Sequence, residues 1–508
     1  MASFTALSPP PPPKPYPPPK NPNNFPSPPF IKTTNPNPTP TFTHADVVRW
    51  TSSITRKCRS GLLSQATSDY SLMLSAGVPP SHVTLVVLLS ACADSPRSAT
   101  LLRLGSSLHA HSFKFGLSSP PGVVVGTSLV DMYAKSGRAD LARKTFDTMP
   151  GRNARSWNAM IDGYMRSGDA ESAIEVFDRA PMRDKVSWTA LIDGFARNGR
   201  FEEALQCFHE MQLEPDVETD YVTVIAAVTA CAGVGALTQG LWLHRYSLGS
   251  LSCQNADTRV GNSLIDMYAR CGRVDLAVQV FDGMCRRSRV SWNSLIVGFA
   301  MNGCAEEALQ RFDLMREEGF EPDCISFTGA LTACAHAGLV DEGLRYYECM
   351  KCIYGISPRV EHYGCIVDLL ARAGRLEDAL GVVESMPMEP NEVVIGSLLS
   401  ACRVHGYVGL AERSMGQLAE LEPGCDANYV LLSNAYAAVG RWDSVGKVRN
   451  EMKSLGIRKR PGCSSVEIDC KVHEFVSGDR SHVCSEGIYA MLDLLHLEME
   501  LYEFETAI

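Results

Sequence analysis

Apolar side chains recur along most of the chain at helical spacing. Between residues 156 and 168, Trp157, Ile161 and Tyr164 stand at positions i, i+4 and i+7, so they share one face of a helix. A glycine ends this stretch, which suits a helix that terminates in the left-handed conformation. Nearly the same pattern occurs three times, as SWNAMIDGYMRSG (156–168), SWTALIDGFARNG (187–199) and SWNSLIVGFAMNG (291–303).

A second amphipathic segment follows each of these copies. It reads DAESAIEVFDRAP, RFEEALQCFHEMQ and CAEEALQRFDLMR in turn, and each has a stripe of Ala, Leu or Ile, and Phe. Proline then breaks the chain before several of the following units, for example in the pairs Pro322-Asp323 and Pro390-Asn391. The pattern therefore predicts helical hairpins.

The hairpins form a repeat that predicts the fold. Ten units of 31 to 41 residues cover residues 47–391 and start near residues 47, 82, 123, 154, 185, 221, 258, 289, 324 and 360. One hairpin cannot bury its own apolar stripe, but stacked hairpins can. We therefore expect an all-α protein, a right-handed α-solenoid with a concave surface, which suits a protein-binding array as well as a nucleic-acid-binding one.

The pattern changes after the repeats. In the segment 392–482, SSVEID and KVHEFV alternate like the strands of a short β-hairpin. In the segment 483–508, Ile488, Leu492, Leu495 and Met499 share one helical face, which predicts a terminal helix. This part could cap the solenoid, as every such array requires.

The net charge and the positions of the cysteines narrow the classes of function that fit the sequence. The 508 residues carry a net charge of -10, which argues weakly against a protein that binds polyanions over its whole surface. Four of the 18 cysteines close an Ala-Cys pair at one position of the repeat, as expected for small buried side chains in a reducing compartment: Cys92, Cys231, Cys334 and Cys402. No apolar run reaches about 18 residues, so we expect no membrane span.

Residues 1–45 differ from the rest of the chain. They hold 16 of the 30 prolines, and no acidic residue occurs before Asp46. Such a composition predicts disorder, either as a Pro-rich tail or as an organelle transit peptide. Because no Arg-rich amphipathic helix is present, a chloroplast fits better than a mitochondrion.

The repeats resemble those of the pentatricopeptide repeat proteins of plant organelles. Long units such as YVTVIAAVTACA (221–232) alternate with short units such as GNSLIDMYARCGRVDLAVQVFDGM (261–284), as in the editing-factor branch of that family. The segments NYVLLSNAYAAVGRWDSVGKVRNEMKSLGIRKRPGCS (428–464) and VHEFVSGDRSH (472–482) are similar to its C-terminal extension motifs.

The resemblance implies a function and partners. It implies a factor that binds single-stranded organellar RNA and selects cytidines for conversion to uridine in chloroplast transcripts. The deaminase would come in trans, from a deaminase-bearing pentatricopeptide repeat protein, together with multiple-site organellar editing factors. The alternatives are an RNA-binding protein for transcript stabilisation, processing or splicing, and a protein-interaction scaffold.

The chain is not expected to be the deaminase itself. Zinc-dependent deamination requires His-x-Glu followed far downstream by Pro-Cys-x-x-Cys. His496 and Glu498 spell the first part with no cysteine after them, and Cys349 and Cys352 lie far upstream inside a repeat. We therefore predict no catalytic residues, no metal and no cofactor.

The resemblance also implies which residues read RNA. In the family, one base is read per unit by the fifth and the last residue of that unit. Within the constant frame of the three copies, the fifth residue is Asn158, then Thr189, then Asn293. Amide, hydroxyl and carboxylate groups can distinguish the edges of unstacked bases. The pairs that fit the family code are Thr127 with Asn153 (adenine), Asn158 with Asp184 (uracil), Thr189 with Asp220 (guanine), Asn262 with Ser288 (cytosine) and Asn293 with Asp323 (uracil).

The other five units depart from that code. Their pairs are Thr51 with Ser81, Val86 with Gly122, Ile225 with Asp257, Thr328 with Arg359, and Gly364 with Asn391. With the family's spacing to the edited base, the expected RNA is N-N-A-U-G-N-C-U-N-N-N-N-N-C, where the last C is the target. Apolar second residues of the units, such as Val83, Val124, Val186, Val222, Val290 and Ile325, are expected either to sandwich bases or to pack between repeats.

Overall fold

The computed structural model describes residues 43–94, 99–117, 122–215, 217–250, 256–422, 424–459, 461–468, 471–477 and 480–506. The segment 1–42, which holds nearly all of the predicted transit peptide, lies outside the described residues.

The described residues form a long series of antiparallel helix pairs followed by one β-hairpin and a last helix. The helices are α1 His44–Arg59, α2 Leu63–Ser75, α3 His82–Ala93, α4 Ala99–Lys114, α5 Val123–Lys135, α6 Ala139–Thr148, α7 Ala154–Ser167, α8 Ala170–Arg179, α9 Lys185–Arg197, α10 Phe201–Leu213, α11 Tyr221–Val234, α12 Leu237–Ser250, α13 Ala256–Arg270, α14 Val274–Gly283, α15 Arg289–Met301, α16 Ala305–Glu317, α17 Cys324–Ala337, α18 Val340–Cys352, α19 Val360–Arg372, α20 Leu376–Ser385, α21 Glu392–His405, α22 Val408–Leu421, α23 Asp426–Ala438, α24 Trp442–Ser454 and α25 Ser485–Thr506. The strands are β1 Cys463–Ile468 and β2 Lys471–Val476.

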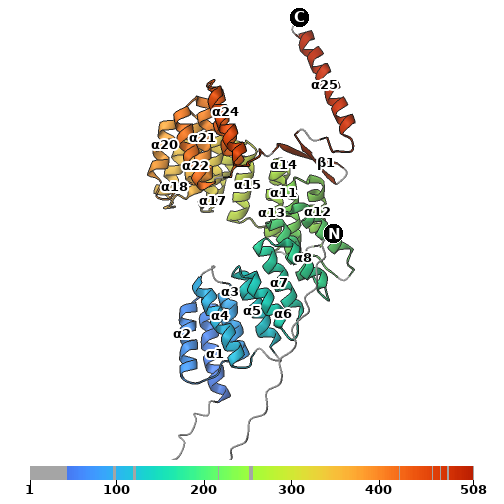
Figure 1. Ribbon diagram of the computed structural model, residues 1–508, viewed down its shortest axis with the longest axis vertical. Helices are drawn as coiled ribbons and strands as arrows, with labels where there is room; N and C mark the ends of the chain where they lie inside the picture. Colours follow the sequence, from blue (N-terminus) through green and yellow to red (C-terminus); the bar gives the residue numbers. More distant parts are fainter. Residues whose placement is uncertain are drawn as a thin grey trace, which may run out of the picture.

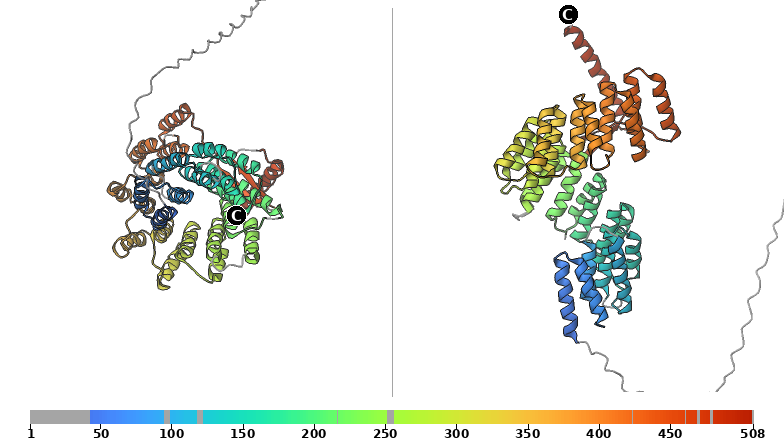
Figure 2. Two further views of the ribbon diagram at one scale, coloured as in Figure 1. Left: turned by 90° about the horizontal axis from the view of Figure 1, so that it is seen from below. Right: turned by 90° about the vertical axis from the view of Figure 1, so that its left-hand side faces the viewer.

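The pairs stack into the predicted α-solenoid. The first helix of each unit packs on the first helix of the next, as α5 does on α7 and α7 on α9. In Figure 1 the array runs from α1 at the bottom to α24 near the top. The view from below in Figure 2 shows the helices arranged in a ring. One continuous apolar core runs from Ile54 to Ala401.

Glycine permits the closest approaches between first helices. A Cβ atom at Gly163 of α7 would lie 2.5 Å from the Cβ of Ala134 in α5, and one at Gly194 of α9 would overlap the side chain of Met165. The predicted left-handed glycines at the helix ends are confirmed, because Gly168 has φ 82° and Gly199 has φ 74°.

The repeated cysteines are buried as predicted. Cys231 and Cys334 are fully buried in α11 and α17, and Cys92 and Cys402 nearly so. Burial raises the pKa of Cys231 to about 12, so its thiol stays protonated at neutral pH. These side chains act as small apolar groups of the core.

The C-terminal extension begins as further solenoid. The pairs α21/α22 and α23/α24 stack after α19/α20, and a second apolar core joins them. The predicted β-hairpin is confirmed, with β1 and β2 antiparallel and Val466 opposite His473. Helix α25 then projects away from the array (Figure 1), and Leu492, Leu495 and Met499 on it are about half exposed, at 52, 48 and 64%.

The β-hairpin returns to the middle of the array, beside α12 (Figure 1). The carboxylate of Glu467 in β1 accepts hydrogen bonds from the backbone N–H groups of Thr238 (2.7 Å) and Gln239 (3.3 Å) in the first turn of α12. Val472 of β2 lines a groove between α10 and α12, together with Trp242. A carboxylate at a helix N-terminus satisfies amides that have no partner within the helix and favours the helix dipole.

None of the helices among the described residues is both long and apolar enough to cross a bilayer.

Replacing Glu467 with Ala should loosen this contact. We expect the amides of Thr238 and Gln239 to exchange hydrogen about fivefold faster, because about 1 kcal/mol of charge-assisted hydrogen bonding is lost. Hydrogen exchange with mass spectrometry would measure the effect. Glu474→Ala, which removes an exposed glutamate of β2, is the matched control, and unchanged exchange in Glu467→Ala would contradict the contact.

Candidate nucleic-acid interface

The predicted reading residues meet where one unit joins the next. The fifth residue lies in the second turn of a first helix, and the last residue of the unit is the N-cap of the following first helix. The caps among the predicted residues are Asn153 of α7, Asp184 of α9, Asp220 of α11, Ser288 of α15 and Asp323 of α17, and each side chain accepts a hydrogen bond from a backbone amide of the first turn. The last residue therefore has a structural role whatever else it does.

Asn158 and Asp184 form a direct pair. Nδ2 of Asn158 donates to Oδ1 of Asp184 at 3.1 Å, and the same oxygen caps α9 by accepting from the amide of Ser187 at 2.8 Å. The carbonyl oxygen of the half-buried Asn158 accepts no hydrogen bond from the described residues. The pair thus holds the amide in one orientation and leaves an acceptor for a ligand.

Asn293 and Asp323 form a similar but more enclosed pair. Nδ2 of Asn293 donates to Asp323 at 2.9 Å, and its oxygen accepts from the hydroxyl of Ser326 at 2.6 Å. Only 4% of Asn293 is exposed, and both the oxygen and the nitrogen of its amide already have partners in the protein.

Neighbouring groups stabilise the ionised form of the Asp323 carboxyl. Burial opposes ionisation of its carboxyl, but hydrogen bonds from Ser326 and Asn293, together with the charge of Arg289, outweigh burial. The pKa of Asp323 therefore lies below its usual value, and the carboxylate is ionised at neutral pH.

In the other three pairs, the fifth and the last residue share only a long hydrogen bond, a bond through a third residue, or none. The hydroxyl of Thr189 contacts that of Thr223 at 2.6 Å, and Thr223 donates to Asp220 at 2.9 Å, so a third residue links this pair. Thr127 and Asn153 are 3.4 Å apart at the limit of hydrogen bonding. No hydrogen bond joins Asn262 to Ser288 among the described residues, and the buried Oδ1 of Asn262 has no partner there.

The first unit repeats the linked arrangement, although its pair departs from the code. Thr51 contacts Thr84 at 2.7 Å, and Thr84 contacts Ser81, the cap of α3, at 2.9 Å. The sequence pattern did not identify this similarity, because it depends on a threonine in the next unit. The shared signal is Thr at the third helical position, as in Thr84 and Thr223.

The apolar second residues lie open to solvent beside these pairs. Val124, Val186 and Val290 are 52, 52 and 57% exposed, whereas other apolar residues of the same helices are buried. Packing between repeats would bury these side chains, so their exposure argues against that alternative. Arg155 and Arg259, which occupy the same position in other units, are also exposed.

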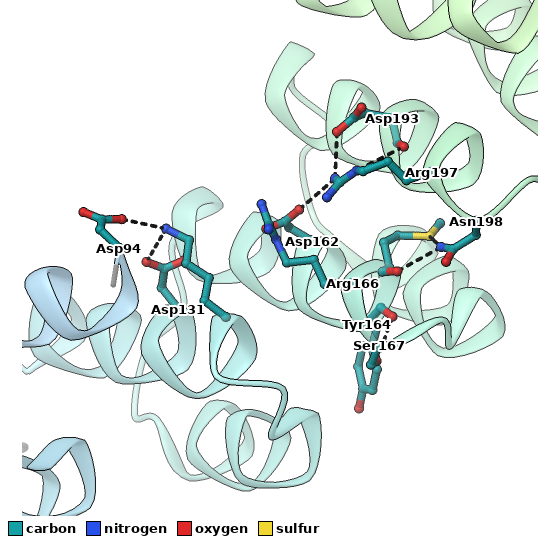
Figure 3. A network of polar contacts seen from close by, with 11 residues as sticks. Asp94, Asp131, Asp162, Tyr164, Arg166, Ser167, Asp193, Arg197 and Asn198 are labelled. Atoms are coloured by element: carbon teal, nitrogen blue, oxygen red, sulfur yellow. Dashed lines mark hydrogen bonds and ion pairs between the residues drawn. The ribbon is translucent and has the colours of Figure 1, made fainter. Parts of the chain in front are cut away.

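A row of charge pairs lies on the same face of the first helices as the fifth residues. The sequence analysis did not identify this row. Asp131, Asp162 and Asp193 each stand four residues after a fifth residue, and a basic residue stands four further on, so all share one helical face. In Figure 3, Arg197 joins Asp193 (2.7 Å) to Asp162 of the preceding first helix (3.2 Å), and Arg166 also pairs with Asp162 (2.6 Å).

The row extends towards the N-terminus by one more unit, and isolated pairs at the same position recur in α13 and α19. Lys135 pairs with Asp131 at 3.1 Å and with Asp94 of the preceding unit at 3.5 Å (Figure 3). Such half-exposed pairs contribute little stability. The signal was present in the sequence as DMYAK, DGYMR, DGFAR, DMYAR and DLLAR, each at the same place in its unit.

The fragments that resemble a zinc site are far apart in the fold. Cys349 and Cys352 lie in the last turn of α18, where Cys352 contacts Glu348, and His496 and Glu498 lie on α25. Within the described residues, no three side chains of His, Cys, Asp or Glu are placed together to hold a metal ion.

Replacing Asp184 tests its capping role. Asp184→Ala should destabilise the start of α9 by about 1 kcal/mol, because the amide of Ser187 loses its acceptor. Asp184→Asn keeps an acceptor oxygen and should change stability little. Hydrogen exchange at Ser187 would separate the two variants, and equal exchange in both would show that the carboxylate does not cap the helix.

Known sequences and structures share both the repeat and the extension. The PPR repeat model matches residues 127–153, 155–183, 186–214, 262–288, 325–353 and 361–389, the PPR repeat family model matches 287–336, and the E motif model matches 405–467. The fold is similar to the crystal structure of the pentatricopeptide repeat protein PPR10 from maize, with a TM-score of 0.57 at 18% identity over 81% of this chain and 59% of that one.

Two curated relatives come from Arabidopsis thaliana. The pentatricopeptide repeat-containing protein At1g05750, chloroplastic, is 55% identical over 90% of this chain and 91% of its own length. The pentatricopeptide repeat-containing protein ELI1, chloroplastic, is 47% identical over 88% of this chain and 69% of its own length. The chain therefore belongs to the pentatricopeptide repeat proteins and carries alternating repeats followed by an E motif.

Proposed function

We propose that this protein is a sequence-specific single-stranded RNA-binding factor that selects cytidines for editing to uridine in chloroplast transcripts. The observation that supports this most is the Asn158–Asp184 pair. The pair is pre-organised at a unit junction by a hydrogen bond of 3.1 Å, and it keeps one acceptor open. The same frame recurs along the array with different polar side chains, as a base-reading surface requires.

The proposed mode of binding uses three features of the same face. The polar pairs contact the edges of unstacked bases, and the exposed second residues, such as Val186, pack against the base planes. The basic residues of the charge row, including Arg166 and Arg197, exchange their Asp partners for phosphates. In this mode the arginines do not need a basic surface, because each would exchange an Asp partner for a phosphate.

The deaminase would be supplied in trans. The E motif at 405–467 and the exposed apolar side chains of α25 support a docking role for the C-terminal extension. The proposed partners are a deaminase-bearing pentatricopeptide repeat protein and multiple-site organellar editing factors. The relatives named chloroplastic support the same compartment for this chain, and the sequence further resembles the Chloroplast Biogenesis Nineteen type of editing factor.

Two other functions would use the same fold. An RNA-binding protein for transcript stabilisation, processing or splicing needs the reading face but not the extension, so deletion of the extension separates it from an editing factor. A protein-interaction scaffold would not require polar residue pairs at the unit junctions that differ from unit to unit while the surrounding repeat sequence stays the same.

A binding comparison tests the proposal. The full chain would be mixed at physiological salt with an RNA that contains A-U-G-N-C-U, whose last U lies six nucleotides before a cytidine, and with an RNA in which those specified bases are scrambled. We expect tighter binding to the first RNA. Equal binding would contradict the assigned code, and no binding to either would favour the scaffold.

Replacing Asn158 tests base reading by one unit. Asn158→Ala should weaken binding by about 1–3 kcal/mol and relax selectivity at the uridine assigned to its unit. Asn158→Thr creates the Thr–Asp combination of the following unit and should shift the preference at that nucleotide towards guanine. A uniform loss over all RNA sequences would instead indicate a structural role for Asn158.

Replacing the charge row tests phosphate contact. Arg166→Gln and Arg197→Gln should each weaken binding equally for all RNA sequences and lower the slope of log K against log salt by about one. Arg179→Gln, which removes an exposed arginine of the second helix α8, is the matched control. An unchanged salt dependence would show that the arginines only pair with Asp162 and Asp193.

A further inference from the structure

An arginine directly precedes the last residue in the three shortest units. Its guanidinium lies over a phenylalanine six residues earlier, and the phenylalanine contacts the tryptophan of the next unit edge to face. We name these three groups the Arg–Phe–Trp stacks: Arg152–Phe146–Trp157, Arg183–Phe177–Trp188 and Arg287–Phe281–Trp292. The distances from guanidinium carbon to ring centroid are 4.7, 5.0 and 4.6 Å, and those between ring centroids are 4.9, 4.7 and 4.7 Å.

Each of the three stacks follows a short second helix, although the equally short α20 is followed by Pro390 and has no such arginine. The second helices α6, α8 and α14 have 10 residues each, whereas α10 and α16 of longer units have 13. The last carbonyls of any α-helix have no partner within that helix. In the longer units the residue before the cap is Thr219 or Pro322, and no guanidinium stands there.

The arginine replaces the missing turn in two of the three stacks. Nε of Arg152 donates to the carbonyl oxygen of Phe146 (3.0 Å), and Nη2 donates to that of Asp147 (3.1 Å). Arg287 makes the corresponding bonds at 3.1 and 3.4 Å. Arg183 keeps the ring contact and donates instead to the carboxylate of Asp178 at 3.1 Å.

Each stack spans the junction between two units. The arginine directly precedes the last residue of one unit, and the tryptophan directly precedes the fifth residue of the next. In the second stack, Arg183 precedes Asp184 and Trp188 precedes Thr189. Asp184 pairs with Asn158 and Thr189 is assigned to the pair with Asp220, so the stack adjoins one residue from each of two successive pairs.

We infer that Arg152, Arg183 and Arg287 are positioning residues for base recognition, which hold the adjacent last residue in place where the second helix lacks its final turn. This inference rests on the proposed RNA-binding function. The planar guanidinium is suited to the role, because it stacks on a ring and presents several N–H groups in a fixed geometry. Selectivity at the short units then depends on side chains that face the second helix and touch no base.

The test compares two variants of the full chain, Arg183→Met and Arg287→Met. Methionine keeps much of the apolar stem and removes the guanidinium. Dissociation constants would be measured for the matched RNA and for RNAs changed at one nucleotide, either the uridine assigned to Asn158–Asp184 or the cytidine assigned to Asn262–Ser288. Arg179→Met is the control, since Arg179 ends α8 four residues before Arg183 and, within the described part of the chain, pairs only with Glu175.

We expect Arg183→Met to lose about tenfold in discrimination at the uridine and to keep discrimination at the cytidine, which is the scale of one base-reading contact. Arg287→Met should lose about tenfold in discrimination at the cytidine and keep discrimination at the uridine. Arg183→Lys and Arg287→Lys should lose less at the same nucleotides, and they carry the test if a methionine variant does not fold. Melting temperatures measured in parallel would separate a general loss of stability from a local one.

Three results would overturn the inference. If each variant keeps full discrimination at its own nucleotide, the arginines do not position the reading residues. If both variants lose discrimination equally at both nucleotides, in proportion to their loss of stability, the stacks are only structural. If the unaltered protein does not discriminate at either nucleotide, the proposed function itself fails and the positioning role fails with it.

Discussion

The structure depends on the hydrogen bond by which the last side chain of a unit caps the first helix of the next. A helix N-terminus leaves backbone amides unsatisfied, and Asn, Asp and Ser are the side chains that satisfy them best. These are also residues that can accept from or donate to a base edge. The cap therefore restricts the last position to a few residue types before any RNA is considered. Where the last residue cannot cap with an oxygen, as at Gly122 and Arg359, the unit also lacks a pair that fits the code.

The fifth residue of a unit does not cap a helix, so it is free of that restriction. Its contact with the last residue depends on the neighbouring unit. Asparagine reaches the cap directly, as Asn158 reaches Asp184. The shorter side chain of Thr189 contacts the cap only through the hydroxyl of Thr223 in the following helix. A reading pair in this solenoid is thus a property of two units, and the third helical residue of the second unit contributes to it.

The C-terminal extension is held at two places. It continues the solenoid through α21–α24, and its β-hairpin then returns to the N-terminus of α12 through Glu467. The extension is consequently fixed relative to units in the middle of the array as well as to its end. For an editing factor, this would set the position of a docked deaminase relative to the bound RNA.

Most local features were determined by the sequence. The helical hairpins, the left-handed glycines, the buried cysteines such as Cys231 and the β-hairpin all follow from spacing within a few residues, because helix and strand periodicity is local. The pairing of Asn158 with Asp184 was implied by the family resemblance, and the structure joins the two side chains by a hydrogen bond. The base-reading role of the pairs stays a prediction.

Other features were decided only by the tertiary structure. The contact of Glu467 with α12 joins residues more than two hundred positions apart, and it depends on how far the solenoid turns over many units. The burial of Asn293, compared with the half-exposed Asn158, depends on the packing of Ser326 from the next helix. A sequence pattern specifies which face a side chain occupies, but the curvature of the stack decides which faces meet, because small rotations between units add up along the array.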